Sequence, residues 1–341
     1  MSAPTCPSPI RRVGADRPSP IRRVTKATTP LRSVPLRSVP TGPAPVRDTP
    51  VVPVPARPVP LRPAPAPTAV TTVVEAGATP AERAVTAAAA MVDPISLDEL
   101  NALAELQTRV DRKYFVPADV FRRLIAALSD QIQVLDMGGR RTFGYESVYF
   151  DTPELSTYRA HVQRRRNRFK ARTRTYTDTG LCMFEVKVKG ARGETVKQRV
   201  PHPQQFRAEL TDDALAHLAT TLREAYHQDA PVGMQPTLVT TYRRTTFVTR
   251  SGDARLTCDT GLVCLDLENE VRDTGTHVLV ESKSAGQGGS VADRFLRDLG
   301  VRPVSVSKYA VAVAALHPEL PSNPWHQTLR RYFEPLQAAA A

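Results

Sequence analysis

The chain has 341 residues and a formal charge of +12 at pH 7, with 41% hydrophobic and 23% charged residues. This length and composition allow one or two packed domains. No apolar run approaches the roughly 18 to 20 residues of a membrane helix, which argues against a membrane span. Proline and arginine occupy the place of a secretory signal's apolar core in residues 1–12, so we expect a cytoplasmic protein.

The first 67 residues form a low-complexity segment in which PSPIRRV and PLRSV each occur twice. They hold 18 of the 31 prolines, and ten Arg and one Lys against two Asp give a net charge of +9. Such a segment cannot bury enough apolar surface to offset its ordering entropy. We expect residues 1–92 to be a disordered basic tail and linker, either simply solvated or associated with a polyanion, a membrane or another protein.

Folded structure is predicted to begin near Asp93 and to combine amphipathic helices with strands. Ser96 and Glu99 form a capping-box pattern ahead of a first short helix. Helical spacing predicts further helices at about 118–135, 211–228, 290–299, 308–316 and 324–333. We assign residues 93–318 to one domain and residues 319–341 to a C-terminal helical extension.

The predicted strands share one feature, a row of charged side chains on alternate positions. In 168–176, Arg168, Lys170, Arg172 and Arg174 alternate with apolar or small residues, so a strand points all four the same way. The same alternation joins Asp111 with Lys113, Glu185 with Lys187 and Lys189, Lys197 with Arg199, Tyr242 with Arg244, Arg255 with Asp259, and Glu281 with Lys283. A solvated sheet face explains one such strand but not seven that are mainly cationic.

Closing this sheet with the charged rows inward would give a tunnel walled by Lys and Arg. Only a polyanion would offset the desolvation of so many cations. Arg and Lys donors suit phosphate oxygens, and the carboxylates among them suit a divalent ion that accompanies phosphate. The charge pattern therefore predicts phosphoryl chemistry or the binding of a phosphate chain.

Nine short sequence motifs occur along the chain in the order in which a known protein family carries them. They are RVDRKY at 109–114, YESVYFDTPELSTY at 145–158, KARTR at 170–174, FEVKVKG at 184–190, KQR at 197–199, TYRRTTF at 241–247, RLTCDT at 255–260, LVESK at 279–283 and VSKY at 306–309. Together they resemble the VTC domain, the polyphosphate polymerase branch of the triphosphate tunnel metalloenzymes. The resemblance implies an α+β fold with an antiparallel β-barrel tunnel flanked by helices. It also implies transfer of the ATP γ-phosphate to a growing polyphosphate chain with Mn²⁺ or Mg²⁺.

The resemblance also implies roles for individual residues. The expected catalytic cations are Lys113, Arg172, Arg174, Lys187, Arg244, Arg255 and Lys308, and the expected phosphate-binding residues are Lys170, Lys189, Lys197, Arg199 and Lys283. Glu281 matches the metal-binding glutamate of the family. We add Glu185 and Asp259 as further metal or outer ligands, with salt bridges to Lys187 and Arg255 as the alternative. Asp111 departs from the family, which usually has Glu there.

The remaining chemistry-bearing side chains are predicted to be structural. Cys6, Cys182, Cys258 and Cys264 form no CxxC motif, so we expect reduced packing residues. Tyr149, Phe150 and Tyr158 fit the core, and His161, His202, His217 and His227 fit the surface.

Two other functions remain open at this point. The same tunnel with water as acceptor would be a tripolyphosphatase or nucleoside triphosphatase. A non-catalytic polyphosphate or nucleic-acid binder would rely on the basic tail. We favour ATP and polyphosphate as the ligands and expect no specific nucleic-acid partner.

Overall fold

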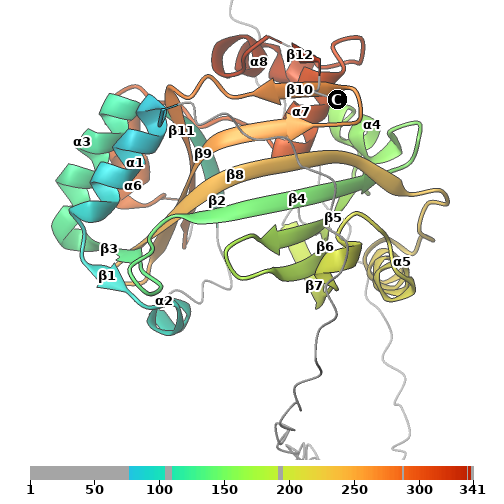
Figure 1. Ribbon diagram of the computed structural model, residues 1–341, viewed down its shortest axis with the longest axis horizontal. Coiled ribbons are helices and arrows are strands. Elements are labelled where there is room, and N and C mark those ends of the chain that lie inside the picture. Colours follow the sequence, from blue (N-terminus) through green and yellow to red (C-terminus); the bar gives the residue numbers. More distant parts are fainter. Residues whose placement is uncertain (1–76, 104–109, 191–194, 286–287, 336, 339–341) are drawn as a thin grey trace, which may run out of the picture. The chain divides into compact units, whose positions relative to one another are not determined.

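The fold is built on one twelve-stranded sheet with helices on both sides, seen in a computed structural model (Figure 1). The structure describes residues 77–103, 110–190, 195–285, 288–335 and 337–338. The strands are β1 (Pro94–Ile95), β2 (Val110–Pro117), β3 (Ile132–Leu135), β4 (Phe143–Asp151), β5 (Phe169–Tyr176), β6 (Leu181–Lys189), β7 (Thr195–Pro201), β8 (Gln235–Thr249), β9 (Ala254–Leu265), β10 (Asn269–Arg272), β11 (His277–Ser284) and β12 (Gln337–Ala338).

Eight α-helices and three short 3₁₀ turns accompany the sheet in the described part of the chain. The helices are α1 (Pro80–Ala90), α2 (Leu97–Leu103), α3 (Ala118–Leu128), α4 (Ser156–Val162), α5 (Asp212–Tyr226), α6 (Val291–Asp298), α7 (Lys308–Leu316) and α8 (His326–Tyr332). The 3₁₀ turns are Ser129–Gln131, Gln204–Phe206 and Asn323–Trp325. None of these described helices is long and apolar enough to cross a membrane.

The strands that carry the charged rows pair antiparallel in the order β2-β11-β9-β8-β4-β5-β6-β7. The predicted α+β class with an antiparallel sheet flanked by helices is confirmed, but the barrel does not close. Among the described residues, β7 pairs only with β6 and β2 only with β11. Closure would set the Lys and Arg row of β7 beside Lys113, and like charges directly opposite each other are destabilising.

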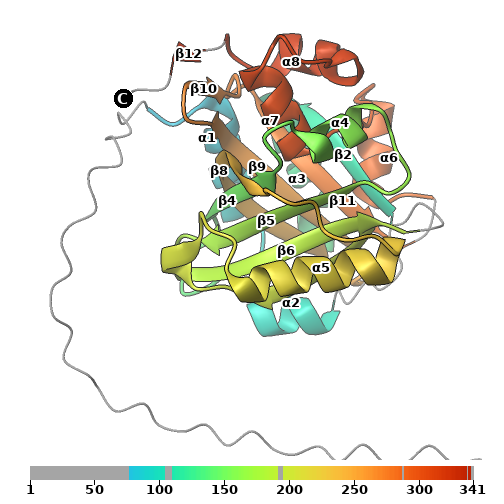
Figure 2. The same cartoon turned by 90° about the vertical axis from the view of Figure 1, so that its right-hand side faces the viewer.

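Helices cover the apolar side of the sheet. α1, α3 and α6 pack on Val116, Phe247, Val278 and Val280, while α5 places Leu218 against the apolar side of β5 and β6. Figure 2 shows α5 lying along these two strands. Because α1, α3, α5 and α6 occupy this side, the charged rows are left to the opposite side, where α7 packs against Tyr149 and Tyr242.

The two ends of the domain differ from the prediction. α1 lies in the segment assigned to the disordered linker, where Thr79 and Glu82 form a capping box and Ala84 and Val85 are buried in the core. Its alanines resemble linker composition, yet their small side chains allow close packing against α3. The domain therefore begins by Thr79 instead of Asp93. The remainder of the predicted disordered tail, residues 1–76, lies outside the described residues.

Two further boundaries are corrected. The helix predicted over 118–135 ends at Leu128, because Ile132 and Val134 alternate as a strand that pairs with β8. The segment 319–341 contains α8 as predicted, but it is part of the domain core. Trp325 and Phe333 are buried there, and the Tyr332 ring stacks 4.0 Å from that of Phe115.

Candidate functional site

Strand register gathers the predicted site residues on one side of the sheet. Cross-strand partners include Lys170 with Lys187, Arg244 with Asp259, and Lys113 with Glu281. Directly opposite residues of an antiparallel pair point to the same side. We call this side the cationic face, and its charged members are Asp111, Lys113, Lys170, Arg172, Arg174, Glu185, Lys187, Lys189, Lys197, Arg199, Arg244, Arg255, Asp259, Glu281, Lys283 and, from α7, Lys308.

Glu185 on β6 is the centre of the first ion-pair group. Its Oε2 atom accepts hydrogen bonds from Arg172 Nε at 2.9 Å and Nη2 at 2.5 Å, and it lies 3.8 Å from Arg174 Nη1. Lys197 Nζ lies 3.5 Å from the other oxygen. Burial alone would raise the pKa of Glu185, whose side chain is only 1% exposed, but these cations together lower it. Glu185 is therefore a buried, ionised carboxylate that fixes two guanidinium groups.

Asp259 on β9 is the centre of the second group. Its two oxygens accept from Arg244 Nε at 2.6 Å and Nη2 at 2.8 Å, and Lys308 Nζ also donates to it. Burial opposes ionisation, but Arg244 and Lys308 lower the pKa of Asp259 to about 2. Lys308 reaches this group because Ser307 caps α7 and starts the helix beside β9.

Glu281 on β11 forms a third, looser group with two lysines. Its Oε1 atom lies 2.6 Å from Lys283 Nζ and 3.7 Å from Lys113 Nζ. Burial again opposes ionisation, but Lys283 and Lys113 hold the pKa of Glu281 well below its usual value. The Glu281 side chain keeps 20% of its surface exposed.

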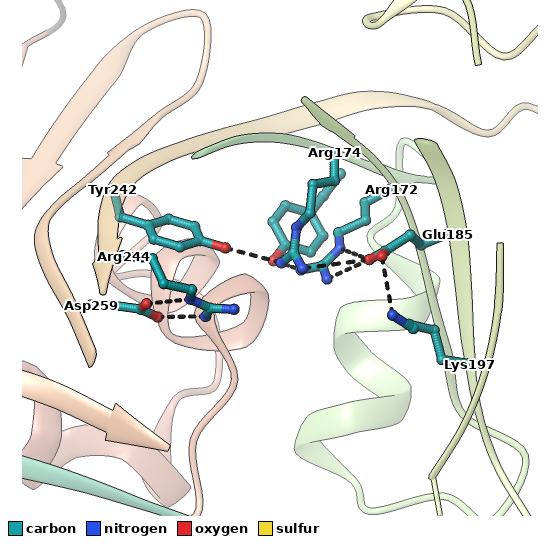
Figure 3. Close-up of polar contacts among 8 residues, drawn as sticks. Arg172, Arg174, Glu185, Lys197, Tyr242, Arg244 and Asp259 are labelled. Atoms are coloured by element: carbon teal, nitrogen blue, oxygen red, sulfur yellow. Dashed lines mark hydrogen bonds and ion pairs between the residues drawn. The ribbon is translucent and has the colours of Figure 1, made fainter. Parts of the chain in front are cut away.

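The first two groups point toward each other from opposite walls, as Figure 3 shows. A hydrogen bond of 3.0 Å from Arg174 Nη2 to the Tyr242 hydroxyl joins them. Burial alone would raise the pKa of Tyr242, but Arg174, Arg244 and Lys308 lower it. The bend of the sheet thus places cations from β5 and β8 around one interior.

Three tyrosines, Tyr145, Tyr149 and Tyr242, complete this interior; the sequence predicted Tyr149 as a core residue and Tyr242 in the row of Arg244, but not Tyr145. Tyr145 stacks on Tyr242 with ring centroids 5.3 Å apart, and the guanidinium carbons of Arg174 and Arg244 lie 5.5 and 5.1 Å from the Tyr145 ring centre. Tyr149 is buried as predicted, and its hydroxyl also accepts from Arg172 Nη1 at 3.0 Å. The alternation of tyrosines along β4 was the signal that could have placed them on the cationic face.

Two lysines lie near the Glu185 group without a direct carboxylate partner in the described part of the chain, Lys170 on β5 and Lys187 on β6. Among the described residues, Lys170 and Lys187 make no ion pair with Asp or Glu. Burial, together with the charges of Lys113 and Arg172, lowers the pKa of Lys170 to about 7. The charge of Arg172 and then burial lower the pKa of Lys187 well below its usual value. Both lysines therefore lose their proton more easily than an exposed lysine, and for Lys187 the charges of Glu185 and Glu281 offset this only in part.

The prediction of surface histidines is wrong for His161 and His202. His161 on α4 places its Nε2 atom 3.0 Å from Lys170 Nζ and 3.1 Å from the Phe169 carbonyl oxygen. Burial, and next the charge of Lys170, lowers the pKa of His161 to about 3. His202 is buried, with its ring nitrogen 2.9 Å from the Phe206 carbonyl oxygen. The tertiary fold buries His202 and half-buries His161, although their local sequences resemble loops and helix ends.

The outer members of the cationic face are less closely engaged with the centre. Arg199 lies opposite Glu185 but is exposed on β7. Arg255 lies opposite Lys283 and donates at 3.4 Å to the Leu100 carbonyl of α2.

The three described cysteines, Cys182, Cys258 and Cys264, are buried and free of disulfides.

Glu281, Glu185 and Asp259, the carboxylates expected to serve as metal or outer ligands, lie in three separate ion-pair groups. Among the described residues, no three His, Cys, Asp or Glu side chains gather into a group that could hold an ion. Glu185 and Asp259 are instead held by arginine forks, and their partners differ from the Lys187 and Arg255 proposed as alternatives. This difference has a physical cause, since residues two positions apart (Glu185 and Lys187) or four apart (Arg255 and Asp259) along one strand lie farther from each other than cross-strand neighbours.

Glu281 alone among these carboxylates fits a divalent cation. Its partners are lysines, which bind as movable point charges, and part of its surface remains open. Mg²⁺ and similar hard ions take one or two carboxylate oxygens and complete their shell with water and phosphate oxygens. This donor set suits an ion that arrives with a phosphate ligand.

Comparisons with known proteins agree with this geometry. The family model described as the VTC domain matches residues 108–317. No curated protein matches the chain. Similar solved structures include a putative adenylate cyclase from Vibrio parahaemolyticus, with 15% identity, 61% of this chain and 99% of that chain covered, and a TM-score of 0.36.

Two other structures are similar at the same level. A putative adenylate cyclase from Bacillus halodurans has 16% identity, with 58% of this chain and 93% of that chain covered and a TM-score of 0.39. A putative adenylyl cyclase from Hippeastrum, with a dominant triphosphatase activity, has 17% identity, with 61% and 96% covered and a TM-score of 0.38. These scores stay below 0.5, so the family assignment rests on the VTC match, which spans more than half of the sequence. The chain belongs to the VTC domain family.

Proposed function

We propose that the cationic face is the active site of a polyphosphate polymerase, which transfers the γ-phosphate of ATP to a growing polyphosphate chain. Membership in the VTC domain family supports a phosphoryl-transfer role. The observation that carries the proposal is the excess of cations that converge on one interior. Twelve Lys and Arg side chains share the cationic face with four carboxylates.

The buried arginines supply the positioning that phosphoryl transfer needs. This reaction requires alignment and charge neutralisation more than covalent help from the protein. Glu185 and Asp259 hold Arg172 and Arg244 in fixed orientations before substrate arrives. Because these forks are already oriented, little reorganisation is needed when they meet phosphate oxygens.

Lys170 and Lys187 are suited to bind the chain itself. Their depressed pKa values reflect burial beside other cations in a ligand-free interior. A bound phosphate would raise both pKa values and restore the ammonium forms, so binding would be coupled to proton uptake. The attacking terminal phosphate oxygen of the chain is already anionic, so no strong general base is required.

Glu281 would hold Mn²⁺ or Mg²⁺ together with phosphate oxygens of ATP. When bound, such an ion neutralises charge on the transferred phosphate. Lys113 and Lys283 would then be released from Glu281 to contact phosphate oxygens directly. A cytoplasmic location, as the sequence predicts, would give this site access to ATP.

Chain growth is favoured over hydrolysis by the balance of charges. The charge of the face exceeds what one nucleotide triphosphate needs, and the surplus cations extend along β5, β6 and β7. An acceptor chain would occupy these surplus cations. A hydrolase needs only space for a water molecule where the polymerase binds its acceptor chain.

The test is product analysis with the purified full chain, ATP and Mn²⁺. We expect a ladder of polyphosphate together with ADP, and removal of residues 1–76 should leave both unchanged, because the packed core begins with α1 and its cap Thr79. Free phosphate and ADP without a ladder would replace the polymerase with a hydrolase. No ADP with either metal, together with loss of polyphosphate binding on removal of the tail, would make the protein a non-catalytic binder.

A further inference from the structure

A strongly basic loop connects α4 to β5, outside the interior described above. We call residues 163–168 the arginine loop, and its cations are Arg164, Arg165, Arg166 and Arg168. The first three are exposed. Among the described residues, none of the four makes an ion pair with a carboxylate. Four cations in five positions therefore lack neutralising partners in this part of the molecule.

Hydrogen bonds to α4 and α5 hold the backbone of the arginine loop in one conformation. Arg165 N donates to the Ala160 carbonyl at 2.9 Å, and the Tyr226 hydroxyl donates to the Arg168 carbonyl at 2.8 Å. Arg164 adopts the left-handed conformation with φ of 53°, where glycine is the usual residue. An arginine in this place adds charge at a conformational cost, and such local cost often marks a functional segment.

A pocket of about 310 Å³ lies beside the loop. Arg165, Asn167 and Gln228 line it, and all three side chains carry N–H donors. Ser156 and Thr157 also line it, but their hydroxyls already donate to Asp151. Donors without a carboxylate among the lining residues favour an anionic ligand such as phosphate.

Positive charge is continuous from the cationic face to this pocket. Arg168 and Lys170 alternate along the start of β5, and Lys189 lies at the adjacent end of β6. Arg168 of the loop and Lys113, Arg172 and Lys189 of the cationic face all lie close enough to lower the pKa of Lys170. An anionic chain can therefore pass from one site to the other without leaving a positive surface.

We propose that the arginine loop and its pocket bind the stretch of polyphosphate that lies outside the cationic face. This inference rests on the proposed function, because it assumes that the interior holds a phosphate chain. The loop itself contains no aromatic residue, and the adjacent Phe169 is buried. Single-stranded nucleic acids are usually held by stacking bases on aromatic side chains, so a polyanion without bases fits this surface better.

The test compares two double variants of the full chain, each lacking two exposed arginines. Arg165→Ser with Arg166→Ser alters the arginine loop, and Arg122→Ser with Arg123→Ser alters α3, which Figure 1 draws at the opposite end of the domain from α4. Affinities for long-chain polyphosphate and for tripolyphosphate are measured over a range of salt concentrations. The loop variant should bind the long chain roughly tenfold more weakly, with a salt slope smaller by about 1 to 1.5. Its affinity for tripolyphosphate should change much less, and the α3 variant should match the native protein with both ligands.

Other results would overturn the proposal. Equal losses for tripolyphosphate and the long chain would show that the loop acts on the interior instead of binding the emerging chain. Equal losses in both variants would reduce the effect to net charge, and a larger loss for single-stranded RNA than for polyphosphate would make the loop a nucleic-acid surface. Arg165→Lys with Arg166→Lys keeps the charge and should retain most of the long-chain affinity, which guards against a folding defect.

The outcome is separable from that of the polymerase proposal. If the native protein forms no polymer from ATP but the loop variant loses long-chain affinity, the polymerase proposal fails and the loop proposal stands. If polymer forms normally and the loop variant binds the long chain like the native protein, only the loop proposal fails.

Discussion

Glu185 and Glu281 lie on the same cationic face but in contrasting surroundings. The Glu185 side chain is 1% exposed and is bound by two arginines and a lysine, whereas the Glu281 side chain is 20% exposed and is bound by two lysines. Arginine forks fix a carboxylate geometrically, whereas lysines are easily displaced by another cation. The contrast assigns Glu185 to positioning the arginines and leaves Glu281 available for a metal ion.

The largest expected effect follows from the buried group. Glu185→Gln leaves Arg172 and Arg174 as buried charges without their anion, and we expect a loss of about 3–5 kcal/mol in the free energy of unfolding. Glu281→Gln should cost only about 1–2 kcal/mol, since its lysines retain access to solvent. Chemical denaturation of both variants measures the difference, and equal costs would remove the contrast.

Smaller effects should follow from changes to the hydrogen bond between Arg174 and the Tyr242 hydroxyl. Arg174→Met removes a cation aimed at the interior, and we expect kcat/KM for phosphate transfer to fall by about 10²–10³. Tyr242→Phe removes only the acceptor of the Arg174 hydrogen bond, so a loss of up to about tenfold is expected. Steady-state kinetics on both variants would separate the cation from its positioning partner. A larger loss for Tyr242→Phe would show that the hydroxyl itself takes part in the reaction.

The smallest effect concerns the pH dependence of phosphate binding. Because the pKa of Lys170 is lowered to about 7, its positive charge is lost as the pH rises above that value. Phosphate groups gain rather than lose negative charge as the pH rises, so a fall in tripolyphosphate affinity toward about pH 9 is the expected mark of the lost lysine charge. Lys170→Arg should flatten this profile, since arginine stays charged. An unchanged profile in the variant would assign the titration to another group.

The same shift has a consequence for folding with the opposite sign. The unfolded chain holds more protons than the folded one between about pH 7 and the usual lysine pKa of 10.5. The stability of the ligand-free protein should therefore rise with pH in this range. Denaturation midpoints measured without phosphate provide the check, and Lys170→Met should weaken the trend.

The sequence predicted the cationic face because alternation is a local property of a strand. Arg172 and Lys170 must point to the same side of β5 whatever its neighbours are. The partner of Glu185 is not local, because it depends on the register between β5, β6 and β7, and the prediction of Lys187 was wrong for that reason. Strand closure likewise depends on the whole sheet, so the open edge at β7 was beyond sequence reasoning.

The helical segments show the same limit. α5 was predicted closely because large apolar residues mark its buried side. α1 was assigned to the linker because alanines mark its buried side, and alanine is also common in linkers. Composition therefore separated the tail from the domain at the wrong residue, although the helical spacing of Ala81, Ala84 and Ala88 was present in the sequence.

The central claim is that Glu281 binds the metal of a phosphate-transferring cationic face. Its most direct test measures ATP turnover as a function of Mn²⁺ concentration in the native protein and in Glu281→Gln. Glu224→Gln, on the exposed side of α5, is the control. The affinity of each protein for tripolyphosphate is also measured without metal. We predict that Glu281→Gln loses metal-dependent turnover but binds tripolyphosphate at least as well as the native protein, because an opposing negative charge is removed. Retained Mn²⁺-dependent turnover in Glu281→Gln, or loss of phosphate binding together with turnover, would contradict the account.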